Sequence, residues 1–327
     1  MLYPVTFFPL LKPILWGGNK ICSFKEITPV QDGIGESWEV SHVKNNVSTV
    51  ANGHLKGKSL DDLIETYGAD LLGKQVYERF GKSFPLLIKF IDAKEALSIQ
   101  VHPNDTLAKE RHNSFGKTEM WYVIDATPGA YLYSGFAKPL TPERYIKSVE
   151  DNSFTDMLAK HEVHTGDVFF LPAGRVHAIG AGCFIAEIQQ TSDITYRIYD
   201  YNRKDAQGNS RELHTELAKE AIDYQIYPDY KLKYTPEPNA IQPLIDCPYF
   251  TTRLININED KTIDLNDRDS FSIYICMQGK LAVTDDLNNI IAIHQGQIVL
   301  IPATTAHITL KPEKECKLLE TFLSKPV

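Results

Sequence analysis

Gly166–His177 reads GDVFFLPAGRVH, and it decides the fold predicted for this chain. Val168–Leu171 consists of residues that favour a buried strand. Pro172 cannot donate to a strand ladder and therefore ends that strand. Gly174 supplies a tight turn, and His177 opens the next strand. The stretch predicts a β-hairpin that holds one imidazole at a fixed place on a sheet.

The same spacing returns in Gly296–His307, which reads GQIVLIPATTAH, with Thr304 in place of the second glycine. Two matching segments predict two copies of one β module. Short runs of β-branched and aromatic residues surround both copies, whereas helical patterns are confined to the first part of the chain. We therefore expect a mainly β fold with inserted helices.

Two helical insertions are expected in the first module. Ser59 precedes apolar residues at helical spacing and has Asp62 in position for a capping box, which predicts helix within residues 59–81. Pro142 follows a threonine, and this pattern predicts a helical stretch over residues 141–160. A proline-rich linker then separates the two modules. The expected domains are residues 1–235 and 236–327.

Composition limits the classes of function. The chain has 327 residues, 43% of them apolar, which is enough for one large core or two ordinary ones. A formal charge of −8 argues against nucleic-acid binding. No apolar run approaches the roughly 20 residues that would span a membrane, and a proline-rich start argues against a signal peptide. Five scattered cysteines without a CxxC pair indicate a reducing compartment, so we expect a cytoplasmic protein.

Leu97–His102 reads LSIQVH and alternates between apolar and polar residues. In a strand, Ser98, Gln100 and His102 therefore face the same side. An apolar face and a polar face suit a strand that lines a cavity. Taken alone, Gln100 is a weak metal-ligand candidate, because a neutral amide oxygen binds zinc less well than imidazole or carboxylate does.

Lys117 and Glu119 are also two residues apart and share one face of a later strand. Together with His102 and His177, Glu119 completes two imidazoles and one carboxylate on neighbouring strands. This is a ligand set for a catalytic divalent metal with an open position. A lone histidine is more often structural, so the hypothesis depends on the combination.

The second module lacks such a set in the corresponding strand. Ser272–Gln278 reads SIYICMQ and contains no His, Asp or Glu. We therefore interpret His307 as structural and expect the second module to be metal-free.

Three charged residues lie within apolar or aromatic runs, namely Lys89, Glu187 and Arg197. A buried charge is costly unless it is paired. The partner of Lys89 is either a protein carboxylate or a substrate phosphate. Glu187 and Arg197 are each either structural ion-pair residues or catalytic groups.

Five motifs together resemble the type I mannose-6-phosphate isomerases (phosphomannose isomerases) in their short bacterial form. They are KPILWGG, LSIQVHPND, KTEMWYVI, GDVFFLPAGRVHAI and AEIQQTSDITYRIYDYNR. The resemblance covers most of residues 1–205 and, weakly, the second copy. It implies two cupin modules, which are jelly-roll β-barrels, the first metal-binding and the second degenerate. The long helical domain of the larger eukaryotic enzymes is reduced here to residues 141–160.

The resemblance also implies a cofactor and roles for residues. It implies one Zn²⁺ per chain and makes Gln100 an expected ligand. Arg197 corresponds to the family's catalytic arginine. The implied metal ligands are Gln100, His102, Glu119 and His177, and the implied pocket residues are Lys89, Ser98, Lys117 and Glu187.

The implied reaction interconverts mannose 6-phosphate and fructose 6-phosphate through a cis-enediolate. A metal and an arginine would stabilise its negative charge. Glu187 is our candidate base, because desolvation raises the pKa of a carboxylate. A metal-activated water is the rival base. Lys89 and Lys117 are candidates for phosphate or hydroxyl contacts.

Two other functions stay open at this point. Two histidines and a carboxylate also describe non-haem iron oxygenases. A non-catalytic cupin that binds sugar phosphates is the second alternative, because fold alone does not fix function. Manganese, cobalt or iron could replace zinc on the same ligands, and the chain is expected to be a monomer or a homodimer.

Overall fold

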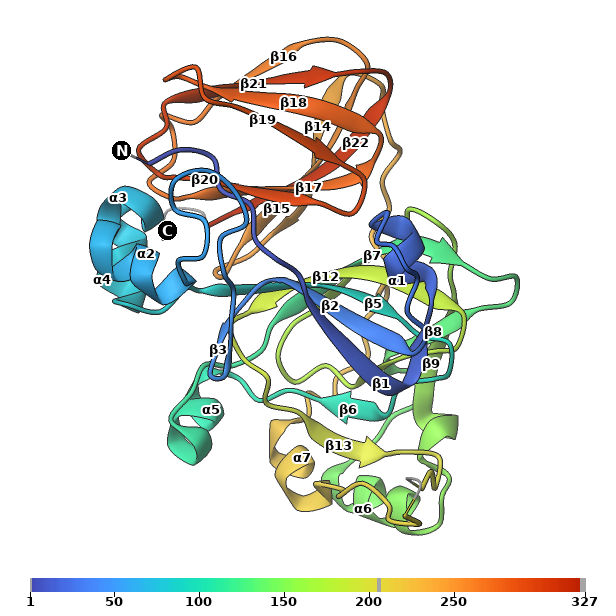
Figure 1. Cartoon of the computed structure of the whole chain (residues 1–327). Helices are drawn as coiled ribbons and strands as arrows, with labels where there is room; N and C mark the ends of the chain where they lie inside the picture. Colours follow the sequence, from blue (N-terminus) through green and yellow to red (C-terminus); the bar gives the residue numbers. More distant parts are fainter. Residues whose placement is uncertain (1, 205–206, 324–327) are drawn as a thin grey trace.

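The computed structural model describes residues 2–204 and 207–323, which form two β modules (Figure 1). In the first module a six-stranded sheet packs against a five-stranded sheet, and one apolar core draws residues from both. The larger sheet has the order β1 (Leu10–Gly18), β2 (Ile34–Val40), β5 (Leu86–Asp92), β12 (Cys183–Gln190), β7 (Glu119–Ala126) and β10 (Val168–Leu171). The smaller has the order β13 (Tyr196–Tyr199), β6 (Ile99–Val101), β11 (His177–Ile179), β8 (Tyr131–Phe136) and β9 (Leu158–Glu162).

The second module repeats this arrangement with two sheets around a second core. One sheet has the order β14 (Ala240–Asp246), β15 (Thr251–Ile257), β22 (Cys316–Phe322), β17 (Ser272–Gln278) and β20 (Ile298–Ile301). The other has the order β16 (Lys261–Asp264), β21 (His307–Pro312), β18 (Lys280–Asp285) and β19 (Ile290–His294). A short ribbon joins β3 (His42–Val43) to β4 (Asn46–Val47). The predicted mainly β fold is confirmed.

The predicted hairpin is wrong, although the repeat is real. Strand β10 pairs with β7 in the large sheet, whereas β11 pairs with β6 and β8 in the opposite sheet. Pro172 and Gly174, whose φ is 92°, turn the chain out of one ladder and into the other. The second copy behaves alike, since β20 pairs with β17 while β21 pairs with β16 and β18. Each segment is thus a connection between two facing sheets.

The first helical insertion is confirmed in a broken form. It consists of α2 (Leu60–Tyr67), α3 (Ala69–Leu72) and α4 (Lys74–Phe80). Ser59 and Asp62 form the predicted capping box. Gly68 and Gly73 have positive φ and interrupt the helix between these segments.

The second helical insertion is shorter than predicted. Helix α6 covers Pro142–Glu150, and a 3₁₀ turn, η1, covers Phe154–Met157. Asn152 between them has a positive φ of 60°, which no helix can continue. Leu158–Glu162 then pairs with β8 as strand β9, so the end of this prediction is wrong. The remaining helices are α1 (Lys20–Phe24), α5 (Asp105–His112) and α7 (Thr215–Ala221).

The two modules share contacts across the predicted domain boundary. Near the N-terminus, Val5 pairs with Leu300 of β20. The buried ammonium of Lys25 contacts Glu39 in the first module and donates to the carbonyl of Gly296 in the second. The division at residue 235 stays a prediction. In the described part of the chain, no helix is both long enough and apolar enough to span a membrane.

Strand register places a second carboxylate where the first module has Glu187. In the first module Glu187 lies opposite Trp121 and Lys89. In the second module Glu320 of β22 lies opposite Tyr274 and Arg253 in the same strand order. The pattern of Ser272–Gln278 gives no sign of Glu320, which lies in a different strand.

In the second module the charge of Glu320 is neutralised by side chains. Tyr274 Oη donates to it over 2.5 Å and Arg253 Nε over 2.8 Å. Arg268 Nη1 donates to Glu320 over 2.7 Å and to Ser272 Oγ over 2.9 Å. Ser272 stands at the strand position that Glu119 holds in the first module, since each lies opposite the last strand residue before the proline, Leu171 or Ile301. A guanidinium therefore occupies the core of this module.

We predict that Glu320→Gln destabilises the protein. The substitution leaves the buried charge of Arg268 without its counter-ion, and breaking a buried pair in this way lowers the free energy of unfolding by about 3–5 kcal/mol. Chemical denaturation measures the change. Glu313→Gln at the exposed surface is the matched control and should stay within about 0.5 kcal/mol of the wild type. A Glu320→Gln protein as stable as its control would contradict this account.

Candidate metal centre

A cavity of about 190 Å³ lies inside the first module. Its walls come from β1, β2, β5, β6, β11, β12 and β13, together with Lys117, which precedes β7, Arg211, and residues that precede β6 and β13. All the pocket residues implied by the sequence motifs line it, as do Gln100 and Arg197. The polar and charged lining residues are Trp16, Glu36, Lys89, Ser98, Gln100, Lys117, Glu187, Thr195, Arg197 and Arg211.

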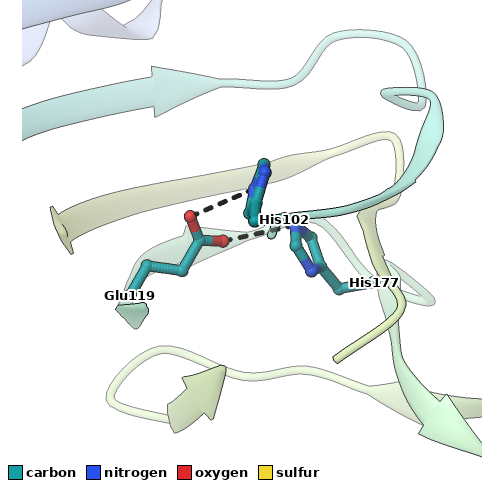
Figure 2. A group of neighbouring side chains, drawn as sticks. All are labelled: His102, Glu119 and His177. Atoms are coloured by element: carbon teal, nitrogen blue, oxygen red, sulfur yellow. Dashed lines mark ion pairs between the residues drawn. The ribbon is translucent and has the colours of Figure 1, made fainter. Parts of the chain in front are cut away.

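His102, Glu119 and His177 converge as predicted (Figure 2). One possible ligand atom from each lies within 4.8 Å of the others, and all three residues are buried. Glu119 Oε2 lies 3.5 Å from Nε2 of His102, and Oε1 lies 3.3 Å from Nε2 of His177. His102 directly follows β6, Glu119 opens β7 and His177 opens β11. Their positions therefore depend on how the two sheets face each other.

Hydrogen bonds orient both imidazoles in the same way. Nδ1 of His102 lies 2.9 Å from the carbonyl oxygen of Ile194, and Nδ1 of His177 lies 2.9 Å from that of Arg175. A carbonyl oxygen only accepts, so each Nδ1 carries the hydrogen and each Nε2 presents a lone pair. Burial, followed by the charge of Lys117, lowers the pKa of both rings. Both are therefore neutral, which is the form that binds metals.

Glu119 carries the least compensated charge of the group. It is fully buried, and in the described part of the chain neither carboxylate oxygen accepts a hydrogen bond of good geometry. Lys117 Nζ lies 2.8 Å from Oε2 as an ion pair. Burial and the nearby charge of Glu187 raise the pKa of Glu119. A divalent cation held by Glu119 and two neutral imidazoles would compensate this carboxylate, so the residues fit a metal.

Gln100 lies beside this group. It pairs with His177 across β6 and β11, and its side-chain amide nitrogen is 3.3 Å from Nε2 of His177. Rotating the amide by half a turn would exchange its nitrogen and oxygen without moving the rest of the chain. Gln100 can thus offer an oxygen at the same place. Its role as a ligand stays a prediction.

The partner of Lys89 is a protein carboxylate. Lys89 Nζ lies 3.3 Å from Glu187 Oε1 and 3.9 Å from Glu36 Oε2. Glu187 also accepts a hydrogen bond from Trp121 Nε1 over 2.9 Å. Glu36 was not predicted as a cavity residue, because the polar and apolar pattern of residues 34–40 does not distinguish it from its neighbours.

The expected upward pKa shift of Glu187 is wrong. Burial acts in that direction, but the positive charges of Lys117 and then Lys89 outweigh it and lower the pKa. Lys117 Nζ lies 4.0 Å from Glu187 Oε1. The prediction considered desolvation alone, because the sequence does not place Lys117 next to this strand.

Arg197 reaches the cavity from β13, where it pairs with Gln100 of β6. Its Nη1 donates to the carbonyl of Glu212 over 3.0 Å, and its buried Nε has no hydrogen-bond partner among the described residues. Arg211 also lines the cavity. It was missed because it lies in an irregular segment without strand periodicity.

Comparison with known proteins supports one family. A sequence model described as "Phosphomannose isomerase type I, catalytic domain" matches residues 10–124. The mannose-6-phosphate isomerase ManA of Bacillus subtilis is 34% identical over 319 residues, which cover 96% of this chain and 97% of that protein. The mannose-6-phosphate isomerase of Streptococcus mutans is 33% identical, with 89% of each chain covered.

Solved structures agree with this assignment. The crystal structure of the mannose 6-phosphate isomerase from Bacillus subtilis has a TM-score of 0.87 at 30% identity, and the match covers 98% of this chain and 99% of that one. A phosphomannose isomerase mutant from Salmonella typhimurium shares the fold with a TM-score of 0.80 at 16% identity, covering 98% and 100%. The chain therefore belongs to the type I phosphomannose isomerases, a family of aldose–ketose isomerases.

Proposed function

We propose that this chain interconverts mannose 6-phosphate and fructose 6-phosphate. The observation that carries the proposal is the convergence of two neutral imidazoles and a buried carboxylate beside a cavity lined by Arg197. The names of relatives that match nearly the whole chain support the same reaction.

The metal proposed for this site is zinc, one ion per chain. His102, Glu119 and His177 would hold it, with Gln100 as the fourth ligand. These are nitrogen and oxygen donors of the kinds that catalytic zinc sites use, although the amide is the weakest of them. When bound, zinc supplies Lewis-acid stabilisation of the negative charge that develops on the substrate oxygens.

The proton transfer is assigned to Glu187. In the open-chain aldose a base removes the proton from C2, which is next to the carbonyl, and the electron pair moves into a cis-enediolate. Return of a proton to C1, together with transfer of the hydroxyl proton from O2 to O1, gives the ketose. Lys117 and Lys89 keep Glu187 ionised, so it is ready to accept the proton. Its low pKa makes it a weak base, and the proposal therefore depends on its place in the cavity wall.

Other residues of the cavity hold the substrate and the developing charge. Arg197 offers a permanent positive charge with planar N–H donors, which would stabilise the enediolate oxygens. Ser98, Lys89 and Lys117 are proposed to contact substrate hydroxyl groups. Lys117 and Glu119 are buried, and this low exposure strengthens the electrostatic interactions between them.

The family assignment favours this isomerase over the two alternatives. A non-haem oxygenase would consume oxygen, and a sensing protein would bind without turnover. We further propose a cytoplasmic monomer or homodimer that binds neither nucleic acid nor membrane. The net charge of −8 argues against nucleic-acid binding.

We predict that His177→Ala removes most of the bound metal, because it deletes one of the proposed ligands. His307→Ala is the matched control, since it changes the corresponding histidine of the second module. Metal per chain, measured by inductively coupled plasma mass spectrometry, should fall well below half of the wild-type value in the first variant only. Equal loss in both variants would contradict the ligand set.

Chelation should abolish the isomerase activity. A coupled assay follows mannose 6-phosphate conversion before and after complete metal removal, and zinc is then restored. We expect at least a 100-fold loss and a substantial recovery, because the developing charge needs its Lewis acid. Turnover that survives metal removal would contradict the proposal, and turnover that requires oxygen would support the oxygenase.

Arg197→Ala should lower kcat by about 100-fold or more, since one charged donor to a developing oxyanion contributes about 3 kcal/mol. The metal content should stay at the wild-type level. Arg197→Lys keeps the charge but loses the planar fork, and it should recover only part of kcat. Loss of metal in Arg197→Ala would instead show that Arg197 supports the site structurally.

A further inference from the structure

The charges that line the cavity are distributed unevenly. Four cations line it, two lysines and two arginines. The lysines lie among carboxylates, because Lys89 contacts Glu187 and Glu36, while Lys117 contacts Glu119 and Glu187. At that end the positive charge is largely cancelled.

The arginine end carries an excess of positive charge. Asp200 is 5% exposed, and its carboxylate accepts hydrogen bonds from both Arg203 and Arg211. Burial and the nearby charge of Arg211 lower the pKa of Arg197, whereas the carboxylates of Asp200 and Glu212 act to raise it. Three guanidinium groups thus share one buried carboxylate, with the exposed Glu212 as the other acidic neighbour.

Asp200 fixes the orientation of Arg211. Arg211 Nε donates to Oδ2 over 2.7 Å, and Nη2 donates to Oδ1 over 2.6 Å. This bidentate contact aligns the planar guanidinium and leaves its Nη1 edge as the part not engaged with Asp200. The Arg211 side chain is 42% exposed and lines the cavity, so a solute can reach it.

The anchoring of Asp200 itself is strong. Arg203 donates to Asp200 Oδ1 from Nη2 over 2.5 Å and from Nε over 3.2 Å. Its Nη1 donates to the carbonyl of Ala96 over 2.6 Å, just before the strand that carries Gln100. Arg211 is therefore tied, through Asp200 and Arg203, to the backbone that leads into the metal-site strand.

We propose that Arg211 binds the phosphate group of the substrate and that Asp200 positions Arg211 for this contact. The inference rests on the proposed function. A guanidinium fork matches phosphate geometry, and a dianion is attracted to the end of the cavity with unbalanced positive charge. The reacting carbons then lie toward Lys117 and Glu119, and Arg211 discriminates phosphorylated from free sugars.

The test measures KM and kcat for mannose 6-phosphate and the inhibition constant of inorganic phosphate. For Arg211→Ala we expect KM and the phosphate inhibition constant to rise together by about 10- to 100-fold, the range of one charge-assisted hydrogen-bonding group. The value of kcat should change by less than about threefold. Arg144→Ala removes the same charge from the exposed surface of α6 and should leave all three constants unchanged.

Asp200→Asn separates positioning from net charge. It makes the region more positive, so a purely electrostatic effect would lower KM. Loss of the bidentate anchor would instead raise KM and the phosphate inhibition constant, and this is the result we expect. A lower or unchanged KM in a folded variant would overturn the positioning role of Asp200. If Asp200→Asn does not fold, Arg211→Lys tests whether the planar guanidinium of Arg211 is needed. An Arg211→Lys protein that binds phosphate as tightly as the wild type would count against the guanidinium contact.

Failure of this inference is distinguishable from failure of the proposed function. Wild-type phosphate affinity in Arg211→Ala, with an active wild-type isomerase, would overturn the phosphate contact alone. An inactive wild-type protein would overturn the proposed function. In that case, calorimetric titration of inorganic phosphate into the wild type and Arg211→Ala still decides whether Arg211 binds phosphate.

Discussion

The site depends on one buried carboxylate that the protein does not satisfy by hydrogen bonding. Glu119 has no exposed surface, and in the described part of the chain its oxygens meet an ammonium and two imidazole lone pairs. Burying such a charge is unfavourable unless a cation compensates it. The backbone contacts of His102 and His177 leave both Nε2 atoms on the side of Glu119, and Nε2 of His102 also accepts from Lys117 Nζ over 3.0 Å. A divalent metal is the partner that suits all three groups.

The second module also buries a carboxylate, Glu320, but at the strand position of Glu187 and not at that of Glu119. Its strands repeat the register of the first, yet Ser272 stands where Glu119 stands, and Arg268 reaches Glu320 in the core. A guanidinium, which belongs to the chain, neutralises the carboxylate permanently. A metal must be bound from solution and can keep a position open for a substrate. The repeated scaffold therefore explains the fold of both modules, and the residues in the two cores explain why only the first offers a candidate ligand set for a metal.

Sequence patterns predicted the elements of the site better than their connections. Strand alternation placed Ser98, Gln100 and His102 on one face, and the cavity confirms that Ser98 and Gln100 share it. The predicted hairpin was wrong, because a proline–glycine turn looks alike whether it closes a hairpin or crosses between sheets. The pKa direction of Glu187 was wrong, because it depends on two lysines from other strands. The position of Arg211 in the cavity wall was not predicted, because Arg211 lies in an irregular segment that has no strand or helix periodicity.

The central claim is that nitrogen and oxygen donors of the first module hold the metal. Zinc-edge X-ray absorption spectroscopy of the purified protein tests this claim most directly. The account predicts a first shell of nitrogen and oxygen atoms only, at about 2.0–2.2 Å, with the multiple scattering of two imidazole rings. A sulfur shell at about 2.3 Å would show that cysteine binds the metal, and a spectrum without imidazole scattering would exclude His102 and His177. Either result would contradict the account.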